Sequence, residues 1–410
     1  MQYFSVYDVL LKKADEKHIS IEEMYSFFKK HNISKKKIDD LQQTVYIADE
    51  KTKMAILAFL EMTELELCLH MGIIPPEYRD SFFANVKEIS QMLKKQDKLV
   101  EKIKNPYYEN DNGKLYNDDC IKVLRNIPDE TVDMVFADPP FNLGKTYDPG
   151  VDDDLTMSQY LNWTYDWLDE CIRVLKPGGR IFIYNLPRWC IYIADYLGKQ
   201  LTYWDWIAID MKYTLPIQNR LYPAHYALVS YVKGTKATTF NNQRIPMQVC
   251  RHCGGELKDY GGYKDKMNPE GINVSDVWTD IYPVRHKNTK NRKYNELPVK
   301  LLDRIISMST NPGDMVLDPF GGSGTTYAVA QALGRKWIGT ELGDCEVIKN
   351  RLINNEQDLR QLEKIYSEKG KLFTEETIDL RTQNGFWTCE SVRRNTEQIT
   401  LEDYMNNKKE

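Results

Sequence analysis

The chain has 410 residues, of which 42% are hydrophobic and 28% are charged, and its formal net charge is −5. This length can bury one large core and a second, smaller one, and the composition is ordinary for a globular protein. No apolar run approaches the ~20 residues of a membrane-spanning helix, residues 1–9 lack the features of a signal peptide, and the eight cysteines are too scattered for a secreted disulfide framework. We therefore expect a cytoplasmic protein with no membrane partner.

Residues 1–100 are predicted to form a helical domain. Apolar residues recur at helical spacing, as in 21–28, and Ser20 precedes that run as an N-cap would. The basic run at 35–37 is interpreted as a solvated face. Two roles stay open for this domain, oligomerisation and target recognition. A polar linker is expected at 101–113, because it holds few apolar residues and a turn signal.

Strands and helices alternate over 114–355, which predicts an α/β fold with a doubly wound, mostly parallel sheet. The expected strands lie at 114–120, 132–137, 180–184, 204–211, 226–232, 315–317 and 336–340. The expected helices lie at 121–126, 157–175, 188–197, 301–308, 327–333 and 343–354. The second of these helices is expected to stop at the Lys-Pro-Gly-Gly of 176–179. Residues 356–410 are expected to be a polar C-terminal tail.

One predicted strand ends in two prolines. The apolar run 132–137 leads into Asp138-Pro139-Pro140-Phe141, and proline cannot donate hydrogen bonds to a sheet. A carboxylate and an aromatic ring therefore lie at the carboxyl end of a strand, where ligands bind in open α/β sheets. An ordinary strand-ending Asp-Pro turn is the alternative.

A second strand leads into the glycine-rich turn of residues 321–324, and a helix follows. Glycines let a backbone approach a ligand, and a helix N-terminus presents free N–H groups to an anion. The next strand ends at Glu341, about 20 residues on, where an acidic side chain can hold ribose hydroxyls. Together these features predict a site for a nucleoside-containing cofactor.

Two motifs carry a family resemblance. Asp138-Pro139-Pro140-Phe141 resembles the catalytic D-P-P-[YF] motif of the DNA amino-methyltransferases, and the stretch from Asp318 to Gly324 resembles their D-x-F-x-G-x-G cofactor motif. The catalytic motif comes first, which is the order of the β group of that family. The resemblance covers 114–355 and implies a Rossmann-like methyltransferase core that uses S-adenosyl-L-methionine.

The resemblance also implies roles for single residues. Asp138 and the Pro139 carbonyl would accept hydrogen bonds from an amino group of the target base, and Phe141, after Pro140, would stack on that base outside the duplex. The expected cofactor contacts are Asp119, Cys120, Lys300, Asp318, Phe320, Gly322, Ser323, Gly324, Thr325, Thr326 and Glu341. For Asp119 a helix cap is an open alternative, and for Lys300 an exposed position at a helix N-terminus.

Residues 233–293 form a basic insert in the predicted core. They include twelve Lys or Arg against six Asp or Glu, together with Trp278 and several tyrosines. Such an insert suits phosphate contacts and stacking, and the resemblance implies target recognition here; a solvated loop is the alternative. The residues expected to contact double-stranded DNA are Lys145, Arg285, His286, Lys287, Lys290, Arg292 and Lys293.

A pair of cysteines lies inside the insert. Cys250 and Cys253 have the spacing of zinc ligands, but no second pair follows at a usable distance in the sequence. We predict two reduced thiols and no metal, with a zinc site as the alternative.

The predicted function is methyl transfer from S-adenosyl-L-methionine to N6 of adenine in a specific DNA sequence, within a restriction-modification or phage-defence system. An aspartate at position 138, in place of serine, favours adenine as a tendency of the family. Cytosine N4 is one alternative, and a non-catalytic DNA-binding subunit with the same fold is another. A homodimer and a partner restriction subunit are expected by analogy alone.

Overall fold

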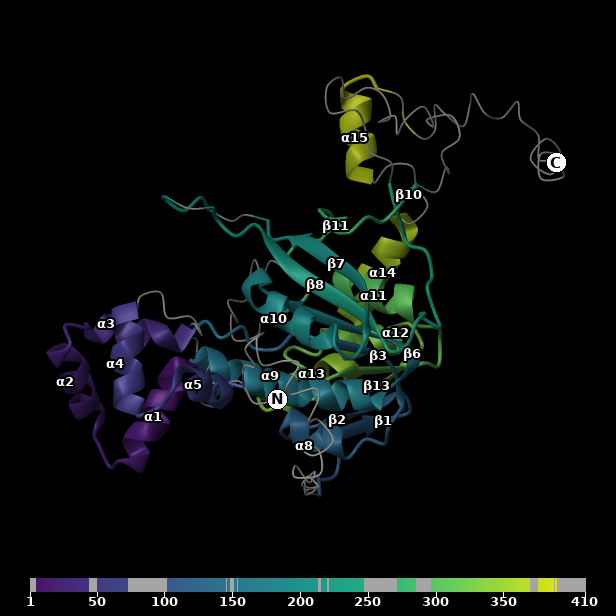
Figure 1. Cartoon of the computed structure of the whole chain (residues 1–410). Helices are drawn as coiled ribbons and strands as arrows, with labels where there is room; N and C mark the ends of the chain where they lie inside the picture. The colour runs from purple at the N-terminus through teal and green to yellow at the C-terminus, as the bar shows by residue number, and fades with distance from the viewer. Residues whose placement is uncertain are drawn as a thin grey trace.

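The structure is a computed structural model. It describes residues 5–43, 50–72, 102–144, 146–147, 151–152, 154–212, 215–219, 221–246, 271–284, 296–368, 375–386 and 388. In this part of the chain a mixed sheet of nine strands lies between two layers of helices (Figure 1). The predicted doubly wound α/β fold is confirmed.

The strands of the sheet follow the order β1-β2-β13-β12-β3-β6-β8-β7-β11. Strand β1 is antiparallel to β2, and β8 is antiparallel to both of its neighbours, while the remaining pairs are parallel. The bounds are β1 (Tyr108–Asn110), β2 (Gly113–Tyr116), β3 (Val132–Ala137), β6 (Leu175–Asn185), β7 (Thr202–Asp210), β8 (His225–Val232), β11 (Val277–Trp278), β12 (Met315–Asp318) and β13 (Lys336–Thr340). Two short antiparallel pairs accompany it: β4 (Thr146–Tyr147) with β5 (Val151–Asp152), and β9 (Arg244–Ile245) with β10 (Ile272–Asn273).

Each face of the sheet buries its own hydrophobic core. In β3 the side chains alternate, so that Met134 and Phe136 join one core while Val135 and Ala137 join the other. One face is covered by α8 (Cys120–Arg125), α9 (Met157–Val174) and α10 (Pro187–Leu197). The other face is covered by α11 (Val299–Ser309), α12 (Thr325–Ala332), α13 (Cys345–Ile353) and α14 (Glu356–Glu368). A last helix, α15, spans Glu375–Gln383.

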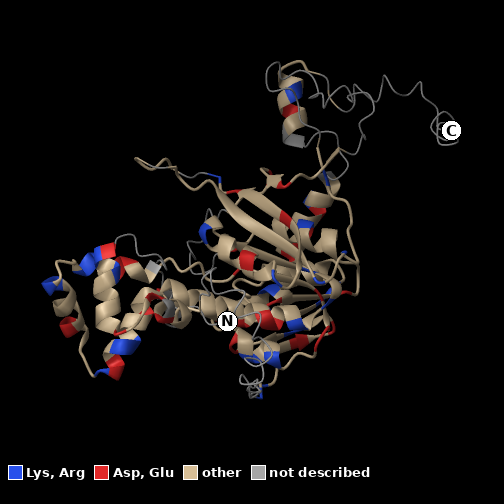
Figure 2. Cartoon of the chain, viewed as in Figure 1, with Lys and Arg blue, Asp and Glu red and all other residues tan. Residues whose placement is uncertain are grey.

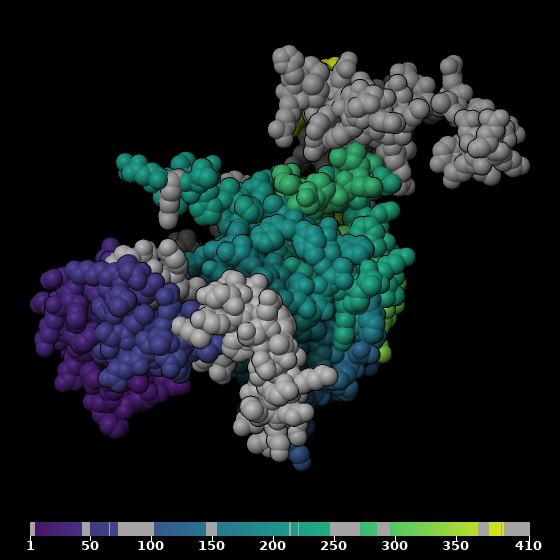
Figure 3. Space-filling model, in the orientation of Figure 1, coloured from purple at the N-terminus to yellow at the C-terminus, as the bar shows by residue number. Residues whose placement is uncertain are grey.

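The N-terminal helices pack around a third core and lie beside α9 (Figures 1 and 3). Asp8 joins them to the sheet domain, because its carboxylate accepts hydrogen bonds from Ser158 at the start of α9 and, at 3.5 Å, from Thr156. Acidic and basic side chains are interspersed over these helices (Figure 2), and the basic run at 35–37 is exposed. The bounds are α1 (Val6–Glu16), α2 (Ile21–Lys30), α3 (Lys35–Asp39), η1 (Asp40–Gln43), α4 (Glu50–Leu60) and α5 (Glu64–His70).

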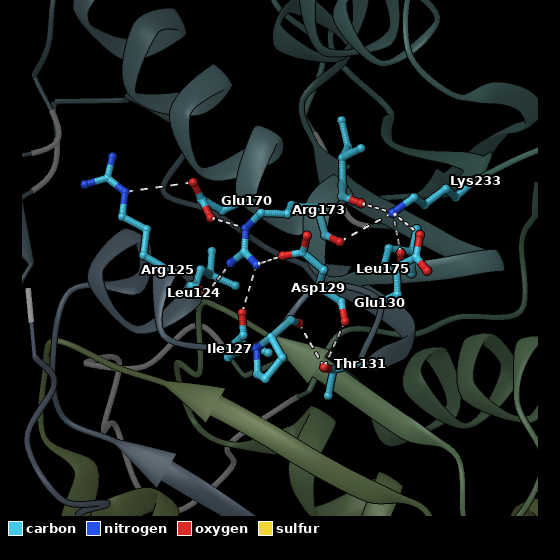
Figure 4. A network of polar contacts seen from close by, with 12 residues as sticks. Leu124, Arg125, Ile127, Asp129, Glu130, Thr131, Glu170, Arg173, Leu175 and Lys233 are labelled. Atoms are coloured by element: carbon cyan, nitrogen blue, oxygen red, sulfur yellow. Dashed lines mark hydrogen bonds and ion pairs between the residues drawn. The ribbon is translucent and has the colours of Figure 1, made fainter. Parts of the chain in front are cut away.

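A polar clamp fixes the loop that enters β3 (Figure 4). Arg173 of α9 donates to the carbonyl oxygens of Leu124 and Ile127 at 2.7 and 2.9 Å and pairs with Asp129 at 2.5 Å. Lys233, one of the cations counted in the basic insert, donates to the Leu175 carbonyl at 2.7 Å. This lysine therefore stabilises the end of α9.

Most predicted elements are present within a few residues of their expected bounds, and four boundaries differ. The expected linker 101–113 contains β1, which hydrogen-bonds to β2 because the intervening turn folds the chain back on itself. The expected helix stop at 176–179 belongs to β6 instead. Leu175 is already extended, and the glycines in this stretch are taken up by an irregularity in the pairing with β3.

Two further differences lie outside the central strands. The insert 233–293 returns to the main sheet, since β11 pairs with β7 in parallel. The expected tail 356–410 begins with α14, whose Leu362 is buried against the sheet and whose Tyr366 hydroxyl donates to Asp303 of α11 at 3.1 Å. Both segments are polar in sequence, and only tertiary contacts determine where β11 and α14 pack. No helix among the described residues is long and apolar enough to cross a membrane.

Candidate active site

Three carboxylates end three neighbouring parallel strands. Asp138 follows β3, Asp318 is the last residue of β12, and Glu341 follows β13. These strands are adjacent in the order β13-β12-β3, so their carboxyl ends meet at one edge of the sheet. The two sequence motifs, about 180 residues apart in the chain, are thus placed side by side, as ligand sites of open α/β sheets require.

The Asp138 carboxylate is partly buried and accepts no hydrogen bond from the residues that the structure describes. Burial raises its pKa well above the usual range, and the negative charge of Asp318 raises it further. The adjacent Pro139 carbonyl also has no donor among the described residues. Two neighbouring acceptors at the edge of the sheet are therefore available to the N–H groups of a ligand.

The following carbonyls are held in place by helices. The Pro140 carbonyl accepts from the Tyr160 hydroxyl of α9 at 2.7 Å, and the Phe141 carbonyl accepts from the Trp189 indole of α10 at 2.8 Å. Asn142 has a positive φ of 52° and closes the loop with two 2.8 Å hydrogen bonds to the backbone of Leu155. These bonds leave the loop little freedom.

Phe141 forms one wall of aromatic rings together with Tyr184 and Tyr226. Its ring lies 6.2 Å from that of Tyr184 and 5.9 Å from that of Tyr226, and the two tyrosines are 4.9 Å apart. Burial and the charge of Asp138 raise the pKa of both tyrosines, so both hydroxyls stay protonated donors. Phe141 is 8% exposed and Tyr184 6%, so both rings belong to the core of this face, and Tyr226 is partly buried against them.

The glycine turn has the shape of a cradle. Gly322 has φ 52°, and a Cβ at this position would meet no atom within 4 Å, so the turn is open on that side. Gly324 has φ 78°, and a Cβ there would lie 2.7 Å from Ile348 of α13. One glycine thus leaves room for a ligand, and the other lets α12 pack closely on α13.

Both other carboxylates shape this cradle. The Asp318 side chain accepts from the Phe320 N–H at 2.9 Å and the Thr326 hydroxyl at 2.5 Å, while that of Glu341 accepts from the Gly322 N–H at 2.7 Å. Burial raises the pKa of Asp318 to about 7 against these two bonds, and the charge of Glu341 adds to the rise. A positively charged ligand would favour the ionised forms of Asp138 and Asp318.

Ser323 and Thr325 face away from solvent toward Arg351 of α13, which the sequence did not single out. The Arg351 guanidinium donates to the Thr325 hydroxyl at 2.9 Å and to the Ser323 hydroxyl at 3.2 Å. It also pairs with Asp358 of α14 through two bonds of 2.6 and 2.9 Å and with Glu296 at 3.0 Å. The spacing of residues in the sequence does not predict these contacts of Arg351, because they join four separate elements. Phe320, expected to contact the cofactor, packs edge-on against Trp163 and Trp167 of α9.

Three other expected cofactor residues already have structural partners. Asp119 caps α8 by accepting from the Lys122 N–H at 3.1 Å, which is the cap considered for it. Cys120 is buried in the core beneath α8 and α9. Lys300 forms an ion pair with Asp280 at 2.8 Å, and that aspartate also binds Arg304, so the structure does not bring Lys300 to the three carboxylates as a free cation.

The residues expected to contact DNA lie outside the described part of the chain. They are Lys145, Arg285, His286, Lys287, Lys290, Arg292 and Lys293, and the cysteine pair Cys250 and Cys253 lies outside it as well. These assignments stay predictions.

The family model described as DNA methylase matches residues 132–350, more than half of the chain. The chain belongs to the DNA methylase family. It is 53% identical to the Type II methyltransferase M.BamHI of Bacillus amyloliquefaciens over 413 residues, which cover 99% of this chain and 97% of that protein. It is 34% identical to the DNA adenine methyltransferase YhdJ of Escherichia coli (strain K12), over 59% of this chain and 82% of that one. A solved structure, the cytosine-N4-specific PvuII DNA methyltransferase, superimposes with a TM-score of 0.43 and 18% identity, covering 62% of this chain and 98% of that one.

This methylase is a methyltransferase, and its cofactor is S-adenosyl-L-methionine. The site fits such a group in two respects. The turn is open at Gly322, and a sulfonium and an ammonium group would favour the ionised forms of Asp138 and Asp318, whose pKa values are raised by burial.

Replacing Arg351 with lysine is expected to weaken cofactor binding. Lysine keeps the charge beside Asp358 but cannot form the forked contacts that hold the glycine turn. We expect an increase in the Kd for S-adenosyl-L-methionine of about tenfold, measured by calorimetry. The matched control is Arg360→Lys, because this side chain is 77% exposed and pairs only at the surface with Glu356. Equal Kd values for both variants and the wild type would contradict the role.

Asp318→Asn is expected to change how stability depends on pH. A carboxyl whose pKa is raised on folding stabilises the fold fully at low pH, and that stability is lost as pH rises from its unfolded value near 4 through about 7. In the asparagine variant this one-proton contribution disappears, which amounts to at most about 1.4 kcal/mol per pH unit. Urea unfolding of both proteins at several pH values between these limits measures the difference. Parallel pH curves would show that Asp318 titrates normally.

Proposed function

We propose that this DNA methylase transfers a methyl group to an exocyclic amino group of a base in a specific duplex DNA sequence. The observation that supports it most is the Asp138 carboxylate beside the Pro139 carbonyl, both without a donor among the described residues, one strand away from the glycine turn. An amino group is the donor that two such acceptors suit. Its lone pair is delocalised into the base, and two hydrogen bonds from its N–H groups to fixed acceptors favour the geometry in which that pair is free to react.

The cofactor supplies the methyl group as an electrophilic carbon on a sulfonium sulfur. We assign its binding to the open turn at Gly322, with Glu341 holding the ribose hydroxyls as in other nucleoside sites. The wall of Phe141, Tyr184 and Tyr226 would hold a base that has left the duplex. Catalysis then depends mainly on positioning and on the fixed charges around the reacting atoms.

The identity of the methylated base is inferred from Asp138, the first residue of the Asp-Pro-Pro-Phe motif. An aspartate at position 138 favours N6 of adenine as the atom that is methylated. N4 of cytosine is the alternative, because it presents the same kind of amino group to the same two acceptors. Duplex DNA is incubated with cofactor labelled with tritium in the methyl group, and the digested nucleosides are separated. Label in adenosine supports N6, and label in cytidine moves the assignment to N4. Incorporation into RNA alone, or into no nucleic acid, would refute the proposal.

We further propose that the chain is the modification enzyme of a restriction-modification system. The similarity to a Type II methyltransferase over almost the whole of both chains supports this role. A restriction endonuclease that cuts the same sequence is then the expected companion. The test is whether DNA methylated by the protein resists one endonuclease of known site while unmethylated DNA is cleaved.

Asp138→Ala is expected to lower the rate of methyl transfer by about a hundredfold or more, since it removes one of the two amine acceptors. Cofactor binding should persist, because the glycine turn belongs to another strand. Asp195→Ala is the control, since this aspartate lies on α10 in an exposed ion pair with Lys199. Full activity of Asp138→Ala would overturn the catalytic assignment, and an inactive wild type would point to the non-catalytic subunit.

Glu341→Ala is expected to raise the Kd for S-adenosyl-L-methionine about tenfold or more, because it removes the charged ribose acceptor and the bond to the Gly322 N–H together. Calorimetry measures the Kd, and Glu346→Ala on the exposed side of α13 is the matched control. An unchanged Kd for Glu341→Ala would leave this residue a purely structural part of the loop.

A further inference from the structure

The described residues of the segment between β7 and β8, namely 211–212, 215–219 and 221–224, form a hairpin that projects from the surface (Figures 1 and 3). Its base is closed by a 2.9 Å hydrogen bond from the Met211 N–H to the Ala224 carbonyl, and Asn219, with φ 61°, lies in the turn at its tip. Large apolar side chains lie on it in contact with solvent: Leu215 is 81% exposed, Leu221 96%, Tyr222 42% and Ile217 38%. Two nearly bare leucines in one hairpin need a partner surface to cover them.

The hairpin begins and ends beside the active site. Strand β7 is parallel to β3 and β12, so its carboxyl end lies at the same edge of the sheet as Asp138. The returning arm enters β8 at His225 and Tyr226, and the Tyr226 ring is part of the aromatic wall, 5.9 Å from Phe141. A base held at that wall must come from a duplex lying along this edge, beside the hairpin.

Charge and length also fit a duplex. The sequence of the hairpin contains Lys212 and Arg220 and no acidic residue, within a chain of net charge −5, and Lys212 pairs with Asp210 at the end of β7. Its rising arm, residues 211–217, can span at most about 25 Å, which exceeds the ~8.5 Å depth of the major groove of DNA. A fully extended arm of this length would bring the tip to the base stack while the base of the hairpin stays at the active site.

We propose that Leu215 and Leu221 insert into the base stack of the bound DNA and fill the space that the target base leaves when it moves to the aromatic wall. Apolar wedges of this kind offset part of the cost of unstacking. The inference rests on the proposed function, since it requires a duplex substrate. It assigns to these two leucines a role in base extrusion, separate from the chemistry at Asp138.

The test uses the full chain and the variant Leu215→Ser/Leu221→Ser. Two duplex oligonucleotides carry the methylated site, once it has been mapped on plasmid DNA: one is fully matched, and the other has an abasic position opposite the target base. We expect kcat/KM of the variant to fall about tenfold or more on the matched duplex, equivalent to about 1.4 kcal/mol. On the abasic duplex the loss should be much smaller, because the target base there is already unpaired.

Matched controls separate the possible outcomes. Met54→Ser/Ile191→Ser removes two apolar side chains that are 58% and 54% exposed on α4 and α10, and it should act like the wild type. An unchanged Kd for S-adenosyl-L-methionine verifies that the hairpin variant is folded. A fluorescent 2-aminopurine at the target position should brighten with the wild type and brighten less with the hairpin variant.

Three results would overturn the wedge. They are equal kcat/KM for the variant and the wild type on the matched duplex, an equal loss on both duplexes, and a wild-type dimer that the variant converts to a monomer in sedimentation. The last result would identify the hairpin as a contact between two copies of the chain. A wild type that methylates no duplex DNA at all would instead refute the proposed function.

Discussion

The desolvation of carboxylates at the ends of adjacent strands is the constraint around which this site is built. Asp138, Asp318 and Glu341 end three adjacent parallel strands, and burial together with neighbouring charge raises the pKa of the first two. The fold tolerates the cluster because Asp318 and Glu341 accept bonds from the backbone of the glycine turn. A cationic cofactor would favour the ionised forms of Asp138 and Asp318 and so offset part of the cost of their desolvation.

Helices on both faces of the sheet hold parts of the site in place. The loop after Asp138 is fixed from one face, by Tyr160 of α9 and Trp189 of α10. The glycine turn is fixed from the other face, by Arg351 of α13, whose guanidinium is itself held by Asp358 of α14. Helix α9 contacts both parts of the site, because Phe320 at the start of the glycine turn packs against Trp163 and Trp167 of that helix.

Two segments leave the sheet and return to it. The hairpin 211–224 begins and ends at strands beside the aromatic wall, and the insert 233–293 returns as β11 at the edge of the sheet. Both segments have ends that are fixed by strands. The strands that position the carboxylates lie further inside the sheet.

The sequence by itself determined the α/β class, the strands that carry the two motifs, and the carboxylates at their ends, because prolines and glycines act locally on the backbone. It did not determine that Lys300 pairs with Asp280, that Arg351 holds the glycine turn, or that the stretch expected to be a tail supplies α14 to the core. Those outcomes depend on contacts between residues far apart in the chain, and no local pattern encodes which partner an arginine or lysine will meet. Tertiary packing alone brought the motifs of residues 138 and 322 to one edge, since strand order is set by how whole layers bury their apolar faces.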